Sequence, residues 1–207
     1  MIIKICGMRN ADNIRAVEQL GADWMGFIFY PGSPRYAGNQ LTYLPERMKR
    51  VGVFVDEAPE KVTELAAHYR LQLLQLHGSE PPDVCRAFRL QGYRVIKVFG
   101  VESGKPFPAE QIQPYEGSCD FFLFDTGTPQ YGGSGKKFCW ELLSDYRGKT
   151  PFLLSGGITP DDADAVRAFS HPQFAGIDLN SGFETAPAMK AVVLLKLFLY
   201  QIRHEQD

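Results

Sequence analysis

Two residues at the ends of apolar runs, Cys6 and Asp125, have side chains suited to moving protons. Cys6 closes residues 2–6 and is followed by Gly7, and Asp125 directly follows the run "FFLF". A carboxyl beside apolar walls is partly desolvated, which raises its pKa and makes it a usable general acid. A thiol has an ordinary pKa of about 8.5, so Cys6 needs a nearby positive charge to act as a base. The residues alone leave an inert buried Cys6 and a capping or ion-paired Asp125 as alternatives.

Three further side chains follow other apolar runs and are candidates for substrate contact. Arg35 lies in "YPGSPRYAG", where its planar guanidinium could pair bidentately with a carboxylate or could simply be solvated. His77 in "QLHG" is either a ligand contact or a hydrogen-bonded histidine at a strand end. Asp178 in "DLNSGFE" could bind a substrate hydroxyl or brace the neighbouring loop.

Two loops that contain glycine predict a phosphate site. Gly156 and Gly157 in "SGGI" allow backbone N–H groups to approach an anion closely. Ser181 and Gly182 are expected just before the last helix, where the positive helix N-terminus offers further donors. Tight turns would explain either loop alone, but the two loops together favour phosphate binding.

A third glycine-rich segment, "YGGSGKKF", resembles a phosphate-binding P-loop only superficially. The P-loop pattern needs glycine where Gln130 stands and Ser or Thr where Lys137 stands, and no strand directly precedes the segment. This mismatch argues against a nucleotide triphosphatase. We interpret residues 127–137 as a glycine-rich loop over the active site.

Eight short apolar runs alternate with amphipathic segments along the chain. They lack strict polar alternation, which is typical of parallel strands covered on both faces. This pattern predicts a (β/α)8 TIM barrel, with a doubly wound open sheet as the alternative. The expected strands are residues 2–6, 24–29, 51–55, 71–76, 94–98, 120–124, 151–154 and 174–178.

Helix signals fall between these runs. Asn10 or Asp12 is expected to cap the first helix, Pro59 fits a first helical turn, and Thr159 begins a capping sequence. The helix after the second strand, in residues 41–50, is weak. In a (β/α)8 barrel the active site lies at the C-terminal ends of the strands. The acid-type groups and glycines described above all fall at that end, which supports the barrel.

The composition indicates a single domain that spans residues 1–207. Hydrophobic residues make up 44% of the chain and the formal net charge is −2, which gives no support for nucleic-acid binding. Residues 186–202 are strongly apolar, but Lys190 and Lys196 make them a packed terminal helix rather than a membrane span. No secretory signal is visible, so a reducing cytoplasm is the expected setting.

The four cysteines are far apart and form no C-x-x-C pair. This spacing argues against a structural zinc site and against a disulfide framework, so no metal is expected. We assign structural roles to Cys85, Cys119 and Cys139. A monomer is the expected state.

An ordered set of motifs resembles the phosphoribosylanthranilate isomerase family of tryptophan biosynthesis. The motifs occur in the family order over nearly the whole chain, and the set is specific although each member is weak. The resemblance implies a (β/α)8 barrel and a cofactor-free Amadori rearrangement of N-(5-phosphoribosyl)anthranilate to 1-(2-carboxyphenylamino)-1-deoxyribulose 5-phosphate. The motifs are "KICGM", "GFIFYPGSPRY", "VGVFVD", "LQLHGSE", "FLFDT", "GGSGKKFCW", "LLSGGI" and "DLNSGFE".

The resemblance also implies a role for most of the candidate residues. Asp125 would be the general acid that protonates the furanose ring oxygen, and Cys6 the general base that removes the C2 proton. Arg35 would contact the anthranilate carboxylate. The phosphate would lie at Gly156, Gly157, Ser181 and Gly182.

Three positions depart from the family pattern: Ser155 stands where Ala is usual, Asn180 where Ser is usual, and Ala188 where Gly is usual. We expect these departures to affect phosphate contacts, and none of them to contact the acid, the base or Arg35. Two alternatives to the isomerase remain at this point. One is a related sugar-phosphate barrel such as the aminoimidazole ribotide isomerase of histidine synthesis, which generally uses two carboxylates. The other is a non-catalytic barrel that binds a phosphorylated metabolite.

Overall fold

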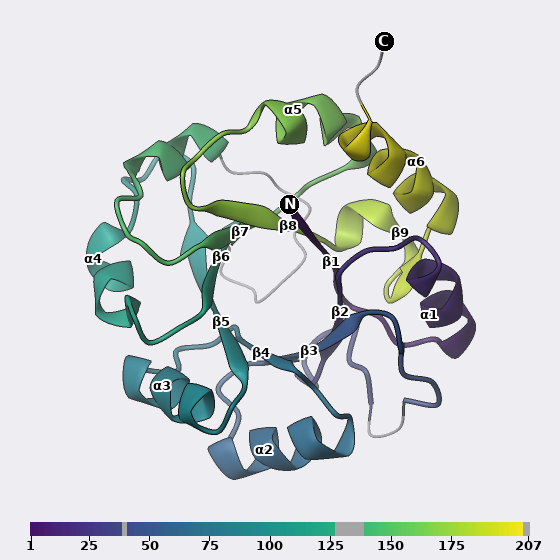
Figure 1. Cartoon of the computed structure of the whole chain (residues 1–207), viewed down its shortest axis with the longest axis horizontal. Coiled ribbons are helices and arrows are strands. Elements are labelled where there is room, and N and C mark those ends of the chain that lie inside the picture. Colours follow the sequence, from purple (N-terminus) through teal and green to yellow (C-terminus); the bar gives the residue numbers. More distant parts are fainter. Residues whose placement is uncertain (39–40, 127–138, 205–207) are drawn as a thin grey trace.

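Eight parallel strands close into a barrel, as the apolar runs predict. The computed structural model describes residues 1–38, 41–126 and 139–204. Each strand pairs with the next along the chain, and β8 pairs with β1 to complete the ring, with helices outside it (Figure 1). The strands are β1 Ile2–Ile5, β2 Trp24–Ile28, β3 Lys49–Phe54, β4 Leu73–Leu76, β5 Arg94–Val101, β6 Phe121–Thr126, β7 Phe152–Leu154 and β8 Phe174–Leu179.

The helices that cover the barrel begin at the expected signals. Asn10 Oδ1 accepts a hydrogen bond from Asn13 N at 3.0 Å, Pro59 lies in the first turn of α2, and Thr159 forms a capping box with Asp162. The helices are α1 Ala11–Glu18, α2 Pro59–His68, α3 Pro82–Leu90, α4 Ala109–Ile112, α5 Ala163–Ala168 and α6 Val192–Arg203. Short 3-10 turns are η1 Gln113–Tyr115, η2 Trp140–Asp145, η3 Pro160–Asp162 and η4 Ser181–Phe183.

Two connections differ from a regular β/α alternation. The described residues between β2 and β3, 29–38 and 41–48, contain no helix, in line with the weak signal there. The glycine-rich loop expected over the active site, residues 127–137, lies outside the described residues. The described part of the link between β6 and β7 contains only η2.

The terminal helix is shorter than predicted, because a small hairpin precedes it. Strands β9 Glu184–Ala186 and β10 Met189–Lys190 pair antiparallel, and α6 begins only at Val192. Lys190 is fully buried and its ammonium pairs with Glu184, so residues 186–190 are held in the hairpin rather than in a helix. For the same reason Ser181 and Gly182 begin the turn η4 and do not directly precede the last helix.

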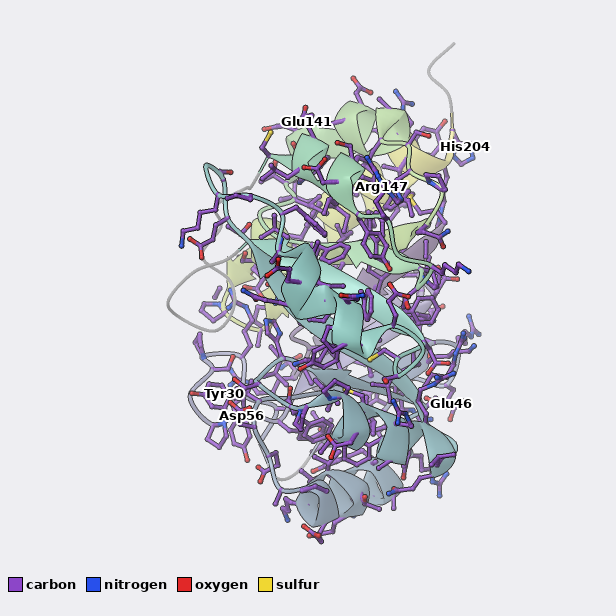
Figure 2. All side chains as sticks on the ribbon, turned by 90° about the vertical axis from the view of Figure 1, so that its left-hand side faces the viewer. Tyr30, Glu46, Asp56, Glu141, Arg147 and His204 are labelled. Atoms are coloured by element: carbon purple, nitrogen blue, oxygen red, sulfur yellow. The ribbon has the colours of Figure 1, made fainter. Side chains whose placement is uncertain are left out.

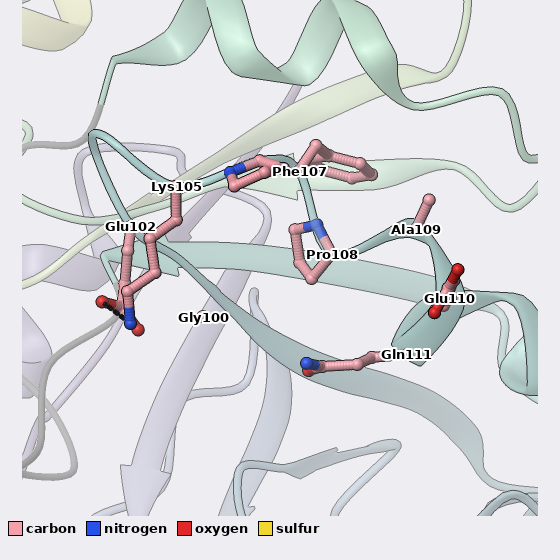
Figure 3. Close-up of a pocket in the computed structure, with 9 residues that line it drawn as sticks. Gly100, Glu102, Lys105, Phe107, Pro108, Ala109, Glu110 and Gln111 are labelled. Carbon is pink, nitrogen blue, oxygen red and sulfur yellow. Dashed lines mark ion pairs between the residues drawn. The ribbon is translucent and has the colours of Figure 1, made fainter.

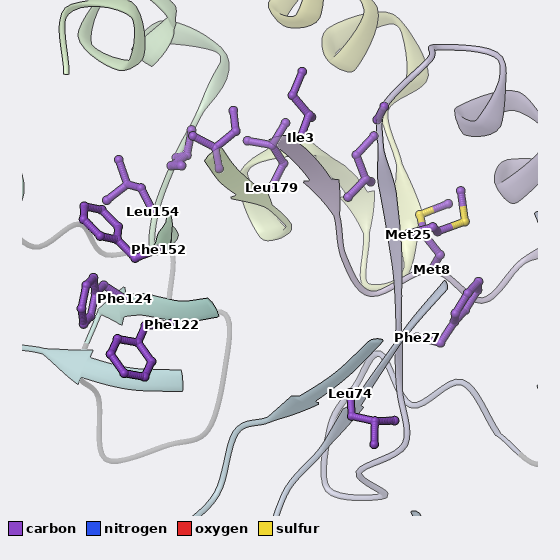
Figure 4. Packing of buried hydrophobic residues seen from close by; sticks show 14 of the residues in the cluster. Ile3, Met8, Met25, Phe27, Leu74, Phe122, Phe124, Phe152, Leu154 and Leu179 are labelled. Carbon is purple, nitrogen blue, oxygen red and sulfur yellow. The ribbon is translucent and has the colours of Figure 1, made fainter. Parts of the chain in front are cut away.

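Buried apolar residues form two clusters that the barrel wall separates. The smaller cluster fills the barrel interior and consists of side chains on the inward face of the strands. The larger lies between the wall and the helices, and includes the rings of Phe122, Phe124 and Phe152, which pack at tilted angles (Figure 4). The interior cluster consists of Trp24, Val51, Leu73, Ile96, Val98, Phe121, Leu123 and Leu153. The barrel is therefore a packed core, and only its open end can receive a substrate.

No helix in the described part of the chain is long and apolar enough to cross a membrane.

Candidate active site

The predicted site residues lie at or just beyond the C-terminal ends of the strands. In Figure 2 this end of the barrel is marked by Tyr30 and Asp56, which follow β2 and β3. Glu46 precedes β3 and lies on the opposite side. Within the described residues, no group of three or more His, Cys, Asp or Glu is arranged to hold a metal ion.

Cys6 lies one residue beyond β1 and is 3% exposed. Its backbone N–H donates to Leu179 O at 2.9 Å, which extends the pairing of β1 with β8 and fixes the cysteine at the barrel mouth. Side chains alternate across a strand, so Lys4 and Cys6 share the inner face of the barrel. Burial raises the pKa of the Cys6 thiol above its ordinary value.

Lys4 supplies the positive charge that the cysteine requires. It is fully buried, and its ammonium donates to Asp178 Oδ1 at 2.8 Å and also hydrogen-bonds Cys6. Burial alone lowers the Lys4 pKa, but Asp178 and Cys6 outweigh it, so the Lys4 pKa is raised and the ammonium stays charged. The same charge lowers the Cys6 pKa and so opposes the effect of burial. Lys4 is not among the site residues predicted from the sequence, although a lysine within an apolar strand is a usable signal.

Asp125, near the end of β6, has the properties of a general acid. Burial raises its pKa to about 6, and the negative charge of Asp178 contributes in the same direction. The hydrogen bond from Thr126 N to Asp125 Oδ1, at 2.8 Å, and the charge of Lys4 limit the rise. At pH 7 a carboxyl with this pKa is still protonated in roughly one molecule in ten, far more often than a carboxyl with an ordinary pKa.

Ser155 corrects one expectation from the sequence. Its backbone N–H donates to Phe124 O at 2.9 Å, which places its side chain beside the next residue of β6, Asp125. The Ser155 side chain hydrogen-bonds the Asp125 carboxyl and lowers its pKa. This departure from the family pattern therefore contacts the candidate acid, contrary to our expectation.

His77 also lies against Asp125. Its Nε2 is 3.8 Å from Asp125 Oδ2, and its Nδ1 is 3.4 Å from Gln75 Nε2. Burial, together with the charges of Lys4 and Lys97, lowers the pKa of His77 to about 4. The imidazole is therefore neutral at neutral pH. Among the described residues Gln75 Oε1 has no hydrogen-bond partner, although the residue is 2% exposed.

Arg35 is buried, which contradicts the solvated-loop alternative. Its guanidinium forms a bidentate pair with Glu184, through Nε and Nη2 at 2.7–3.0 Å. The Arg35 side chain also passes close to the backbone of Gly7, where a Cβ would lie 2.8 Å from Arg35 Cδ. Arg35 thus lies beside the β1 end that carries Cys6.

The two predicted phosphate loops meet at the barrel mouth. A Cβ on Gly182 would lie 2.1 Å from Ile158 O, so η4 packs directly on the loop that follows β7. In the described part of the chain the backbone N–H groups of Gly157, Ser181 and Gly182 have no hydrogen-bond partner. Unpaired N–H groups from two adjacent loops are suited to binding an anion.

A surface pocket near the end of β5 contains no predicted site residue. It has a volume of about 560 Å³ and is formed by the segment that joins β5 to α4 (Figure 3). Glu102 and Lys105 form an exposed ion pair at its edge. Because both side chains are solvated, the pair adds little to binding.

The interior thus brings together Cys6, Asp125, His77 and Asp178, with the Lys4 ammonium among them. Arg35 and the phosphate loops lie at the rim. This arrangement provides a proton donor, a candidate proton acceptor and two places for anionic groups, so it suits an acid–base reaction on a small anionic substrate.

The chain is similar to proteins of one family over its whole length. The family model for N-(5'phosphoribosyl)anthranilate (PRA) isomerase matches residues 3–201. The N-(5'-phosphoribosyl)anthranilate isomerase of Phocaeicola vulgatus is 52% identical over 205 residues, which cover 99% of both chains.

Solved structures give the same result. The phosphoribosyl anthranilate isomerase of Thermus thermophilus superposes with a TM-score of 0.82 at 32% identity, over 98% of each chain. A second, in complex with reduced 1-(o-carboxyphenylamino)-1-deoxyribulose 5-phosphate, has a TM-score of 0.79 at 31% identity, over 98% of this chain and 99% of the other.

Proposed function

The chain belongs to the N-(5'-phosphoribosyl)anthranilate isomerase family, and we propose that Cys6 and Asp125 are the base and the acid of its reaction. The enzyme is an aldose–ketose isomerase of tryptophan biosynthesis. It converts N-(5-phosphoribosyl)anthranilate to 1-(2-carboxyphenylamino)-1-deoxyribulose 5-phosphate by an Amadori rearrangement.

Asp125 acts first in this proposal. Its carboxyl donates a proton to the furanose ring oxygen, the C1–O bond breaks, and the amine lone pair forms the C1=N bond of a Schiff base. The raised pKa of about 6 supports this role, because it keeps protonated carboxyl available near neutral pH. The neutral His77 beside Asp125 adds no positive charge that would lower the pKa of the acid.

Cys6 acts second. Its thiolate removes the proton from C2, the C2–H electron pair forms a C1=C2 bond, and the C1=N π pair returns to the nitrogen. The resulting enolamine then tautomerises to the ketose. A buried thiolate is costly, so the role of Cys6 depends on the Lys4 ammonium beside it. This arrangement, in which Cys6 and Asp125 both face the Lys4–Asp178 pair, is the observation that carries the proposal.

Two rim sites hold the ends of the substrate in this proposal. Arg35 binds the anthranilate carboxylate, and the phosphate accepts hydrogen bonds from the backbone at Gly157, Ser181 and Gly182, with Gly156 shaping the same loop. Asp178 and His77 contact the ribose between these ends. The unpaired N–H groups of the two loops support the phosphate position.

The proposal also treats residues 1–207 as one domain that works as a cytoplasmic monomer. Every proposed site residue comes from one chain, so a second copy is not needed to complete the site. All four cysteines are free thiols, and the proposed base must stay reduced, which supports a reducing compartment. Sedimentation at micromolar concentration tests the monomer.

The direct test supplies freshly made N-(5-phosphoribosyl)anthranilate and follows the loss of its fluorescence. We expect rapid decay with the wild-type chain, and turnover lower by about 10²- to 10⁴-fold in Cys6→Ala and in Asp125→Asn. Circular dichroism should show that both variants are folded. Near-native turnover in either folded variant would refute its assigned role.

A further inference from the structure

Three buried charged side chains, Arg35, Glu184 and Lys190, form a network at the barrel rim. Their side chains are 10%, 5% and 0% exposed. Glu184 accepts from Arg35 and from the Lys190 ammonium, and that ammonium also donates to Asn180 Oδ1 at 2.8 Å. Buried charges are retained at a cost in desolvation, so a cluster of three calls for a functional explanation.

The pairing with Glu184 uses only one edge of the Arg35 guanidinium. Glu184 takes the side-on edge formed by Nε and Nη2. Within the described residues, Nη1 of Arg35 has no acceptor. The end-on edge, with one N–H from each Nη atom, therefore stays available, and its geometry matches a second carboxylate.

The charge of the network points to the same ligand. Two cations and one anion leave a net charge of one positive unit in a largely dehydrated place. A single carboxylate would neutralise it, and an uncharged group would leave the excess charge unpaired, which is costly in such a place.

Glu184 is held from two sides, so it can fix the direction of Arg35. Its Oε1 also accepts from Ala188 N at 3.2 Å, within the β9–β10 hairpin. The hairpin is anchored to α1, because Asn13 exchanges two hydrogen bonds with the backbone of Lys190 at 2.8 and 2.9 Å. A carboxylate positioned this firmly leaves Arg35 little rotational freedom.

We infer that Glu184 is a positioning residue, which holds the side-on edge of Arg35 so that the end-on edge receives the substrate carboxylate. This inference rests on the proposed role of Arg35. It makes Glu184 a determinant of specificity for aryl amines that carry a carboxylate beside the nitrogen, although Glu184 itself does not touch the substrate.

The test compares the affinity of two ligands in each variant. The ligands are reduced 1-(o-carboxyphenylamino)-1-deoxyribulose 5-phosphate and the analogue whose phenyl ring lacks the carboxylate. We expect wild type to prefer the carboxylated ligand by roughly 10- to 100-fold. Glu184→Ala should reduce this preference about tenfold, and Glu184→Gln, which keeps one acceptor oxygen, should lie between. For the natural substrate, Glu184→Ala should raise KM far more than it lowers kcat.

Three further measurements make the test decisive. Glu116→Gln alters a carboxylate that pairs with Tyr146 outside the site, and it should leave the preference unchanged. Arg35→Lys should lose the preference, and adding Glu184→Ala to it should reduce it no further, because both act through one contact. Unchanged affinity for the analogue without the carboxylate shows that each variant is folded.

Two outcomes would overturn the inference. An unchanged preference in folded Glu184→Ala would make Glu184 merely structural, and a stronger preference would make it a competitor for Arg35. Both differ from failure of the proposed carboxylate site, in which wild type itself would not distinguish the two ligands.

Discussion

The ammonium of Lys4 lies 2.8 Å from Asp178 Oδ1 in the barrel interior, and the two residues come from adjacent strands at opposite ends of the chain. Lys4 also interacts with Cys6 and with Asp125. One buried cation therefore acts on both the proposed base and the proposed acid. It favours ionisation of the thiol and limits the rise of the carboxyl pKa.

A plot of kcat/KM against pH should have a rising lower limb and a falling upper limb. Asp125 has a pKa of about 6 and the Cys6 pKa lies above its ordinary value. At pH values between these two pKa values, Asp125 and Cys6 together hold a single proton. The reactive form, with Asp125 protonated and Cys6 ionised, is a constant minor fraction of that state. We expect kcat/KM to rise through about pH 6, level off, and fall above the Cys6 pKa. A single falling limb near pH 6 would contradict this scheme.

Ser155→Ala should move the lower limb to higher pH. The Ser155 hydroxyl lowers the Asp125 pKa, so its removal lets burial raise that pKa further. The shift is measured from pH–rate profiles of the two proteins, with the exposed Ser144→Ala as a control that should leave the limb in place. If the lower limb of Ser155→Ala lies at the same pH as that of wild type, Ser155 does not affect the Asp125 pKa.

Asp125→Asn should stabilise the fold at neutral pH although it strongly lowers turnover. The folded pKa of about 6 exceeds the unfolded value of about 3.9, so stability falls as pH rises from about 4 to about 6, and the loss persists at pH 7. A neutral amide avoids this loss, and we expect the free energy of unfolding to rise by up to about 3 kcal/mol. Urea titrations at pH 7 and pH 4 check this, since the gain should vanish at pH 4.

Lys4→Gln should raise the Cys6 pKa and slow the reaction. The amide can still donate to Asp178 but carries no charge, so the main influence that lowers the Cys6 pKa is lost and only the weaker effect of the Lys190 charge still opposes burial. We expect kcat to fall by about 10- to 100-fold, which corresponds to roughly 1.4–2.7 kcal/mol of lost stabilisation, and the upper limb to move to higher pH. Lys97→Gln is the matched control, because Lys97 is an equally buried lysine that pairs with Glu80. It should cost stability without moving the upper limb.

Ser181→Asp should abolish the thermal protection that inorganic phosphate gives the protein. A carboxylate at this position repels the anion from the unpaired N–H groups of Ser181 and Gly182. Melting curves with and without phosphate measure the effect, and Ser170→Asp, on an exposed loop at the other end of the barrel, should retain the protection. Equal protection in both variants would place the phosphate elsewhere.

The strands were predictable because their signal is local. Buried parallel strands are short apolar runs, and all eight runs became barrel strands with ends shifted by a few residues. The same reasoning failed for residues 186–202, where apolar composition suggested one helix. Lys190 is buried there only because Glu184 and Asn13 satisfy it, and no local pattern shows those partners.

The sequence by itself determined the fold class and the residue types of the candidate site, because strand ends of a barrel converge wherever they lie in the chain. Only the tertiary structure decided the pairings that control these residues. Lys4 and Asp178 are 174 residues apart, and Arg35 and Glu184 are 149 apart. A pKa or an arginine orientation depends on such neighbours and on burial, and both arise only when the barrel closes.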